Sequence, residues 1–346
     1  MKNLSLRKGL LSVAAAACAL TSIGSFDALA EDVNVYSYRK EVLIRPLLDS
    51  FTKKTGINVN LVSGKADALL ERLKNEGMNS PADLLLSADA GRLIRAQEAG
   101  VLQAVKSDAL DKLVPAQFRD PAGNWFGLSL RSRVIFYAKD RVKPEELSTY
   151  EALADSKWDD RICIRSSGNI YNQSLLASLI VHNGAEKAEK WAKAVVENLA
   201  RKPQGGDRDQ IKAVASGECD VAVANTYYFG KMVAGKDAKQ KKAAEAVALY
   251  WPNQQDRGAH VNISGGGVTK AAKHKEAAVK LLEYLASDEA QKIYANEVYE
   301  FPIRDSIKPS PVVAKWGTFK ADDVNLAKFA AYQADALKIF DRVGWR

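Results

Sequence analysis

The chain has 346 residues, and its 50 Lys and Arg against 42 Asp and Glu give a formal net charge of +8. This length is large for one hydrophobic core and sufficient for two lobes, while the hydrophobic fraction of 47% is ordinary for a globular protein. The basic residues are spread evenly and often stand beside acidic ones, so the charge indicates a solvated surface and argues against nucleic-acid binding.

The N-terminus has the layout of a cleavable secretory signal over residues 1–30. A basic start precedes an apolar stretch at 10–20, and the small-residue site 28–30 follows. The apolar stretch is too short to cross a bilayer, and no other long one follows. We therefore expect a soluble protein exported to the periplasm. Lipid attachment at Cys18 is a weaker alternative, because the alanines before it form no lipobox.

Two cysteines, Cys163 and Cys219, remain after cleavage. An even number in an oxidising compartment favours a disulfide. Both lie in segments that are predicted as strands, and neighbouring strands would bring them within bonding distance. The sequence does not show that the strands are neighbours, so two reduced, buried cysteines remain the alternative.

Short apolar strands alternate with helices along the first part of the chain. Strands are predicted at 33–38, 57–64 and 82–89, and helices at 41–56, at 65–77 and from residue 91. Repeated strand–helix units of this length predict an α/β fold in which mostly parallel sheets are flanked by helices.

Two extended segments are predicted to cross between the lobes. One is the run at 124–140, whose alternation is broken, and the other is 258–270, whose three consecutive glycines suit a bend or a close approach. A helical pair follows at 273–297. Lobe 1 is predicted to comprise 31–128 and 261–300, and lobe 2 to comprise 129–260 and 301–346. Two crossing strands leave a cleft between the lobes, where small ligands bind.

Catalysis has little support in the sequence. His182 stands at a predicted helix end, His274 at a charged helix start and His260 in the returning segment, and none of these settings is typical of a general base. The common hydrolase, zinc-protease and phosphate-loop motifs are absent. An enzyme is therefore the weaker hypothesis.

Three tyrosines carry the strongest chemical signal. Tyr227 and Tyr228 follow the apolar strand "DVAVANT", and neighbouring side chains of a strand meet at one point only where the strand ends and the backbone turns. Tyr171 has an analogous place just before a predicted helix. The carboxyl edge of a parallel sheet is where ligands sit in open α/β folds, so we expect the three to converge on the cleft.

Phenol oxygens suit a hard cation. A phenol is neutral at pH 7 and becomes an anionic ligand only when a strong cation displaces its proton, as ferric iron does. Zinc would require Cys or His, and calcium would require clustered carboxylates. For the Tyr-Tyr dipeptide alone, ordinary packing is the simpler interpretation.

The chain resembles the ferric-iron-binding periplasmic proteins of ABC iron importers, which are two-lobed type II solute-binding proteins. The resemblance covers essentially the whole mature chain. It rests on the order and spacing of six segments: "NVYSYR" (34–39), "PADLLLSADAGRL" (81–93), "LRSRVIFYAK" (130–139), "CIRSSGNIYNQSLLAS" (163–178), "ECDVAVANTYYFG" (218–230) and "NISGGGVTK" (262–270).

This resemblance implies that Tyr171, Tyr227 and Tyr228 are iron ligands. Many members add a His-Tyr pair after the first strand, where this chain has Lys40 and Glu41. The departure is similar to a subgroup in which an anion such as carbonate fills the vacant positions.

Arg39, Lys40 and Arg131 are the candidates for holding that anion, because a guanidinium grips a planar oxyanion at two points. An ordinary inter-lobe salt bridge is the alternative for the two arginines. Tyr38 and Glu41 are possible extra oxygen ligands.

The resemblance also implies that a loaded monomer delivers iron to an inner-membrane ABC permease. Two rival hypotheses remain: a binding protein for a polyamine, thiamine or an oxyanion, and a periplasmic enzyme.

Overall fold

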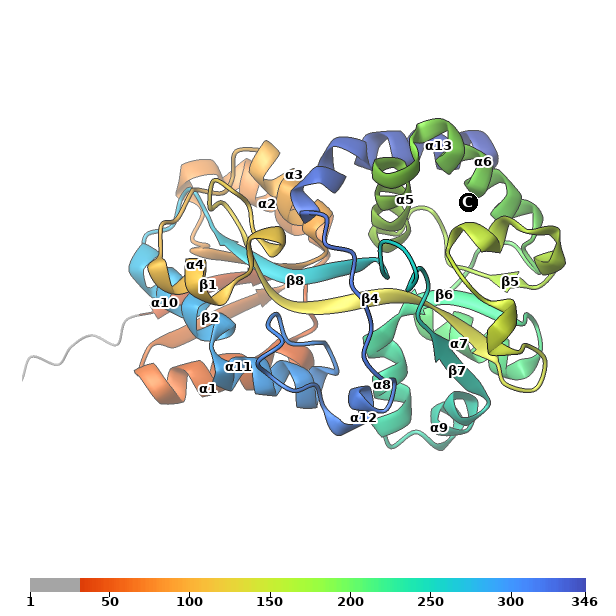
Figure 1. The fold of residues 1–346 in the computed structure, drawn as a ribbon. Coiled ribbons are helices and arrows are strands. Elements are labelled where there is room, and N and C mark those ends of the chain that lie inside the picture. The colour runs from red at the N-terminus through yellow and green to blue at the C-terminus, as the bar shows by residue number, and fades with distance from the viewer. Residues whose placement is uncertain (1–31) are drawn as a thin grey trace, which may run out of the picture.

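The computed structural model describes residues 32–346, which form two lobes side by side (Figure 1). The predicted signal peptide and Cys18 lie outside these residues. Within the described range, no helix is both long and apolar enough to cross a membrane.

Lobe 1 is built on parallel strands. β1 (Asp32–Ser37) lies between β2 (Asn58–Ser63) and β3 (Leu84–Ala88), and both pairings are parallel. β8 (Val261–Val268) adds antiparallel to the free edge of β3.

Lobe 2 has a mixed sheet. β6 (Val221–Asn225) is parallel to β5 (Ile162–Cys163) and antiparallel to β4 (Phe126–Ala138). β7 (Val247–Tyr250) pairs antiparallel with β4. The α/β class with two lobes is confirmed, and β4 is the strand that makes this sheet mixed, because it enters from the other lobe.

Helices cover these sheets because each presents one apolar stripe. In α1 (Glu41–Thr55) the buried residues Ile44, Leu47, Leu48 and Phe51 recur at helical spacing, and Gly56 ends the helix with φ of 75°. The other helices are α2 (Ala66–Glu76), α3 (Ala90–Glu98), α4 (Asp108–Leu113), α5 (Ile170–Asn183), α6 (Ala185–Glu197), α7 (Asp207–Ser216), α8 (Thr226–Ala234), α9 (Ala238–Glu245), α10 (Lys275–Ala286), α11 (Asp288–Ile293), α12 (Pro311–Ala314) and α13 (Gln333–Val343). Short helical turns lie at Gly77–Asn79, Ala116–Phe118, Pro144–Glu146, Glu151–Ala154, Ser156–Trp158, Tyr294–Val298 and Leu326–Tyr332.

The two predicted crossing segments are the strands β4 and β8. β4 pairs with β8 over 126–132 and with β6 or β7 over 133–138, so one strand belongs to both sheets. The glycines of β8 serve close packing. A Cβ on Gly265 would collide with the carbonyl oxygen of Phe126, and one on Gly266 would lie 2.6 Å from Leu86.

Cys163 and Cys219 form a disulfide, with their Cα atoms 5.8 Å apart. The parallel pairing of β5 with β6 makes this possible, because Cys163 lies opposite Ala222, three residues beyond Cys219. The predicted disulfide is therefore confirmed, and the alternative of two reduced cysteines is not.

Separate apolar cores underlie the two lobes, and the C-terminal segment contacts both. Leu326 and Phe329 join the core that contains β1 and β3, whereas Ile339 and Phe340 of α13 join a core of lobe 2. In Figure 1 this segment runs from α12 across β4 to α13. The boundaries predicted for the two lobes remain predictions.

Candidate functional site

Tyr227 and Tyr228 occupy the first turn of α8, directly after β6. The strand ends at Asn225 and the helix begins at Thr226, so the predicted turn of the backbone is confirmed. The two rings lie with their centroids 4.1 Å apart. Tyr227 is buried, with 8% of its surface exposed, and Tyr228 is half-buried. In a strand these two neighbouring side chains would point to opposite faces of the sheet. At the start of α8 their rings lie side by side instead.

Tyr171 meets this pair from a second helix start. It is the second residue of α5, whose cap Asn169 accepts a hydrogen bond from the Tyr171 backbone N–H at 2.9 Å. Its hydroxyl lies 3.4 Å from the hydroxyl of Tyr227. The prediction that the three phenols converge agrees with this geometry, although Tyr171 stands inside the helix and not before it. Positive ends of helix dipoles favour negative charge at both positions.

Burial favours the neutral form of Tyr227 and Tyr228. The pKa of Tyr227 is raised well above 10, first by burial and then by the neighbouring Tyr171 and Tyr228, while Arg131 acts in the opposite direction. The pKa of Tyr228 is also raised, again first by burial. Tyr227 and Tyr228 therefore enter any metal complex as proton donors, and their oxygens become anionic only as protons leave.

Arg131 lies beside the phenols, and one edge of its guanidinium makes no hydrogen bond. Its guanidinium carbon is 5.2 Å from the centre of the Tyr171 ring, and the residue is 1% exposed. Nη1 donates to the Ile263 carbonyl and to the Ser264 hydroxyl. Nε and Nη2 have no hydrogen-bond partner, and the nearest carboxylate oxygen, on Asp89, is 3.6 Å from Nη2. A pair of guanidinium N–H groups can bind a carboxylate or carbonate at two points.

Arg39 is the second buried guanidinium. Its Nη1 donates to Glu300 at 2.9 Å and to Ser264, and its Nε has no partner. Burial opposes the charge of Arg39, but Glu300, Tyr294 and Tyr227 together outweigh it, so the pKa of the guanidinium is raised. Both arginines thus form ion pairs, as the salt-bridge alternative proposed. Arg39 and Glu300 both come from the ranges predicted for lobe 1, whereas Arg131 comes from the range predicted for lobe 2 and its partner Asp89 from lobe 1. By these predicted boundaries, only the Arg131–Asp89 pair joins the two lobes.

The remaining sequence candidates are Tyr38, Lys40 and Glu41. Tyr38 stacks on the guanidinium of Arg92 at 4.0 Å, and Glu41 is exposed and paired with Arg45 at 2.5 Å. Lys40 is exposed at the cap of α1. Among described contacts, none brings these three side chains to Tyr171, Tyr227 or Tyr228.

Several charged residues of the site were not singled out from the sequence. Lys231 lies one helical turn beyond Tyr227 and Tyr228, and its pKa is lowered to about 8 by burial and by nearby cations that include Arg39 and Lys40. Helical spacing from the tyrosine pair would have identified it.

A buried group around Asp207 was also missed. Its carboxylate accepts hydrogen bonds from Arg133 at 3.2 Å, from Arg165 at 3.1 Å and from the backbone N–H of Asn225 at 2.9 Å. It therefore holds the start of α8. No local sequence signal joins these distant residues.

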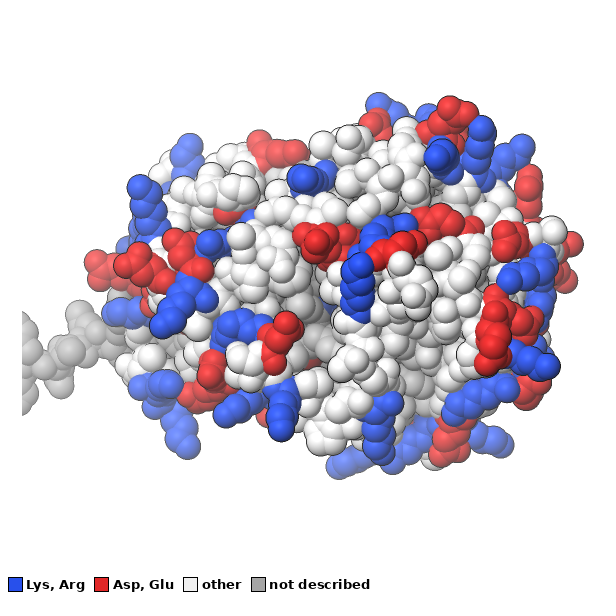
Figure 2. Space-filling model, viewed as in Figure 1, with Lys and Arg blue, Asp and Glu red and all other residues white. Residues whose placement is uncertain are grey.

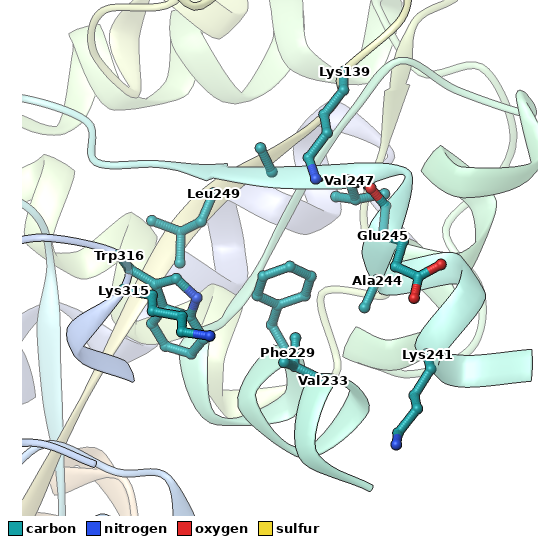
Figure 3. Close-up of a pocket in the computed structure, with 11 residues that line it drawn as sticks. Lys139, Phe229, Val233, Lys241, Ala244, Glu245, Val247, Leu249, Lys315 and Trp316 are labelled. Carbon is teal, nitrogen blue, oxygen red and sulfur yellow. Dashed lines mark hydrogen bonds between the residues drawn. The ribbon is translucent and has the colours of Figure 1, made fainter. Parts of the chain in front are cut away.

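The space between the lobes at this point is narrow. A gap lined by Asp89, Arg131, Arg133, Tyr171, Asn225, His260 and Asn262 has no room for a water molecule. A wider concavity of about 600 Å³ lies on lobe 2 around Phe229 and Trp316, with Lys139, Lys241 and Lys315 at its rim (Figure 3). The tyrosines do not line it. The site is identified by the phenols and the Arg131 guanidinium that lie close together, and not by the size of a cavity.

Other metal or catalytic arrangements lack support in residues 32–346. In that range, no group of three or more His, Cys, Asp and Glu side chains could hold a metal ion. His182 pairs with Asp322 at 2.7 Å and His274 with Asp83 at 3.0 Å. His260 is buried, and its pKa is lowered to about 3, first by burial.

Comparison with known proteins gives a consistent result. The chain matches the family described as bacterial extracellular solute-binding protein over residues 79–321. Iron uptake protein A1 of Synechocystis sp. is 51% identical over 316 residues, which cover 91% of this chain and 88% of that protein.

Solved structures agree with the sequence matches. A Trichodesmium protein in complex with iron and citrate ligands has a TM-score of 0.88 at 51% identity, and the match covers 91% of this chain and 100% of that one. A ferric binding protein from Campylobacter jejuni has a TM-score of 0.87 at 41% identity, with the same coverage.

Proposed function

Because the chain belongs to the bacterial extracellular solute-binding protein family, we propose that it captures ferric iron in the periplasm and delivers it to an ABC permease of the inner membrane. The observation that carries the proposal is the convergence of Tyr171, Tyr227 and Tyr228 beside a guanidinium with one edge that makes no hydrogen bond. The relatives are solute-binding proteins, and we propose that this chain likewise has no enzymatic activity.

Tyr171, Tyr227 and Tyr228 are the proposed iron ligands. Three phenolates carry three negative charges, which match a ferric ion, and their hard oxygens suit it. Packing alone does not explain why the Tyr171 and Tyr227 hydroxyls meet at 3.4 Å from two helix starts, with the Tyr228 ring lying beside that of Tyr227. Displacement of their protons couples binding to pH, so acid weakens it.

An anion completes the proposed site. Nε and Nη2 of Arg131 and Nε of Arg39 are buried donors without a hydrogen-bond partner, although buried donors normally have one. A carbonate or a carboxylate group satisfies them, and citrate accompanies iron in the Trichodesmium relative. We retain Lys40 as a third anion-binding residue, since its charge acts on Lys231 near the site. Tyr38 and Glu41 are left as less favoured extra ligands.

Partners follow from this role. The proposed partners are ferric iron, its anion and the permease, and the protein is proposed to act as a monomer. Figure 2 shows basic and acidic side chains interspersed over the visible face, which favours a solvated surface over a nucleic-acid site.

Reconstitution tests the proposal directly. The purified protein is loaded with ferric citrate and bicarbonate, and its visible spectrum is recorded. We expect an orange-red phenolate-to-iron charge-transfer band that is lost in the double variant Tyr227→Phe/Tyr228→Phe. Tyr250→Phe, on β7, is the matched control and should retain the band. A colourless wild-type protein, or a band that survives in the double variant, contradicts the proposal.

A further inference from the structure

Glu300 is a buried carboxylate that the proposed ligand set does not use. It is 1% exposed and follows Tyr299, which adopts a left-handed φ of 61°. The next residue, Phe301, exchanges backbone hydrogen bonds of 2.8 Å with Leu130 of β4 in both directions. The backbone on either side therefore holds the carboxylate against the crossing strands.

The partners of Glu300 converge from both crossing strands. Ser129 of β4 and Ser264 of β8 stand opposite each other in the strand register, and both hydroxyls donate to Glu300. Arg39 donates to the same carboxylate from the loop after β1. Burial alone would raise the pKa of Glu300, but Arg39, Arg131 and Ser129 outweigh this effect and lower it, so the group is ionised.

Ser264 connects the two arginines. Its hydroxyl donates to Glu300 at 3.1 Å and accepts from Nη1 of Arg131 at 3.2 Å and from Nη1 of Arg39. In each guanidinium, Nη1 is therefore held on the Glu300 side. The buried nitrogens without a hydrogen-bond partner are Nε of Arg39 and both Nε and Nη2 of Arg131. Nη2 of Arg131 lies 3.6 Å from the Asp89 carboxylate.

We infer that Glu300 is a positioning residue for the anion site, because it fixes which edge each guanidinium presents to the anion. It holds Arg39 directly and Arg131 through Ser264. The inference rests on the proposed function, because it concerns the anion that accompanies iron. The fixed geometry selects a small planar oxyanion, either carbonate or one carboxylate group, which accepts two parallel N–H bonds. A spherical anion such as chloride cannot accept both in the same way.

A purely structural ion pair would behave differently. In that case removal of Glu300 would lower stability, and the anion dependence of iron binding would not change. If Glu300 positions the guanidiniums, its removal frees both of them to turn, and the anion binds more weakly while the tyrosines still bind iron. The readout is therefore the anion concentration required, and not iron binding alone.

The experiment compares Glu300→Gln, Ser264→Ala and the control Glu297→Gln, whose side chain is exposed three residues earlier. Each protein, freed of bicarbonate, receives ferric nitrate and increasing bicarbonate, and the charge-transfer band is followed. We expect the half-saturating bicarbonate concentration to rise roughly 10- to 100-fold in Glu300→Gln, the range found when partners of metal ligands are removed. A smaller rise is expected in Ser264→Ala, with no change in Glu297→Gln. Circular dichroism checks the fold of each variant.

The outcomes separate the two proposals. A wild-type protein that forms no coloured complex with either bicarbonate or citrate overturns the iron-binding proposal itself. A coloured wild type whose Glu300→Gln and Ser264→Ala variants need the same bicarbonate overturns only the positioning role. If Glu300→Gln fails to fold, Ser264→Ala decides, because it removes the connection to Arg131 and retains the ion pair.

Discussion

Binding of ferric iron should release one proton from each tyrosine that becomes a ligand. The perturbation is the single variant Tyr227→Phe or Tyr228→Phe, which removes one phenol and keeps its ring. Because burial raises the pKa of both phenols above 10, each is almost entirely protonated at neutral pH. Ionising one at about pH 7 therefore costs at least about 4 kcal/mol, at about 1.4 kcal/mol for each pH unit below its pKa.

The sign and the slope follow from these pKa values. Metal binding stabilises the deprotonated form, so the apparent affinity falls as pH falls, by roughly tenfold for each ligand phenol and pH unit. Three ligands give a slope of about three in the logarithm of affinity against pH, and each Tyr→Phe variant lowers that slope by about one.

The assay counts protons directly. Ferric nitrilotriacetate is added to protein at about pH 7 in a pH-stat, at an excess that saturates every variant. Protons from the chelator and from bicarbonate are common to all the proteins, so the difference between the wild type and each variant isolates one phenol. Tyr250→Phe is the control. An iron-bound Tyr227→Phe that releases as many protons as the wild type would refute the assignment of Tyr227 as a phenolate ligand.

Two further predictions concern stability. The disulfide closes a segment of 56 residues, so Cys163→Ser/Cys219→Ser should lower the free energy of unfolding by about 4 kcal/mol in urea titrations; a loss below about 1 kcal/mol would contradict this constraint. His260 remains neutral in the folded state because its pKa is lowered to about 3, whereas the unfolded chain takes up that proton below about pH 6.5. Stability should therefore fall by about 1 kcal/mol more between about pH 6 and about pH 5 in the wild type than in His260→Gln, and equal slopes would contradict the buried neutral histidine.

Local patterns accounted for most of the fold. Apolar alternation and helical spacing located β1, α1, β2, α2, β3 and α3 within a few residues, because a buried face imposes its period on the sequence. The long run at 124–140 and the glycines at 265–267 identified both crossing strands. Neither β7 nor the mixed order of the second sheet was anticipated, since strand order depends on contacts between distant segments.

In the candidate site, too, local sequence identified some residues and could not place others. Tyr227 and Tyr228 were identifiable because a strand followed by a turn places both on one side, and Tyr171 because it begins the helix of an equivalent unit. Lys40 and Glu41 stand where many members of the resembled family have a His-Tyr ligand pair, and Tyr38 was a further candidate ligand. No described contact joins any of the three to these tyrosines. Whether these side chains reach the tyrosines depends on the direction in which each one points. The periodicity of the sequence does not specify that direction.

The sequence by itself determined the two-lobed fold and the crossing strands, and it predicted the phenol chemistry, since these depend on residue type and local spacing. Only the tertiary structure decided the pairing of Cys163 with Cys219 and the meeting of Tyr171 with Tyr227. It also decided that Glu300 holds Arg39, a partner 261 residues away along the chain. Such contacts form when separate strands and helices pack together, so the chain encodes them through the whole fold and not through any single segment.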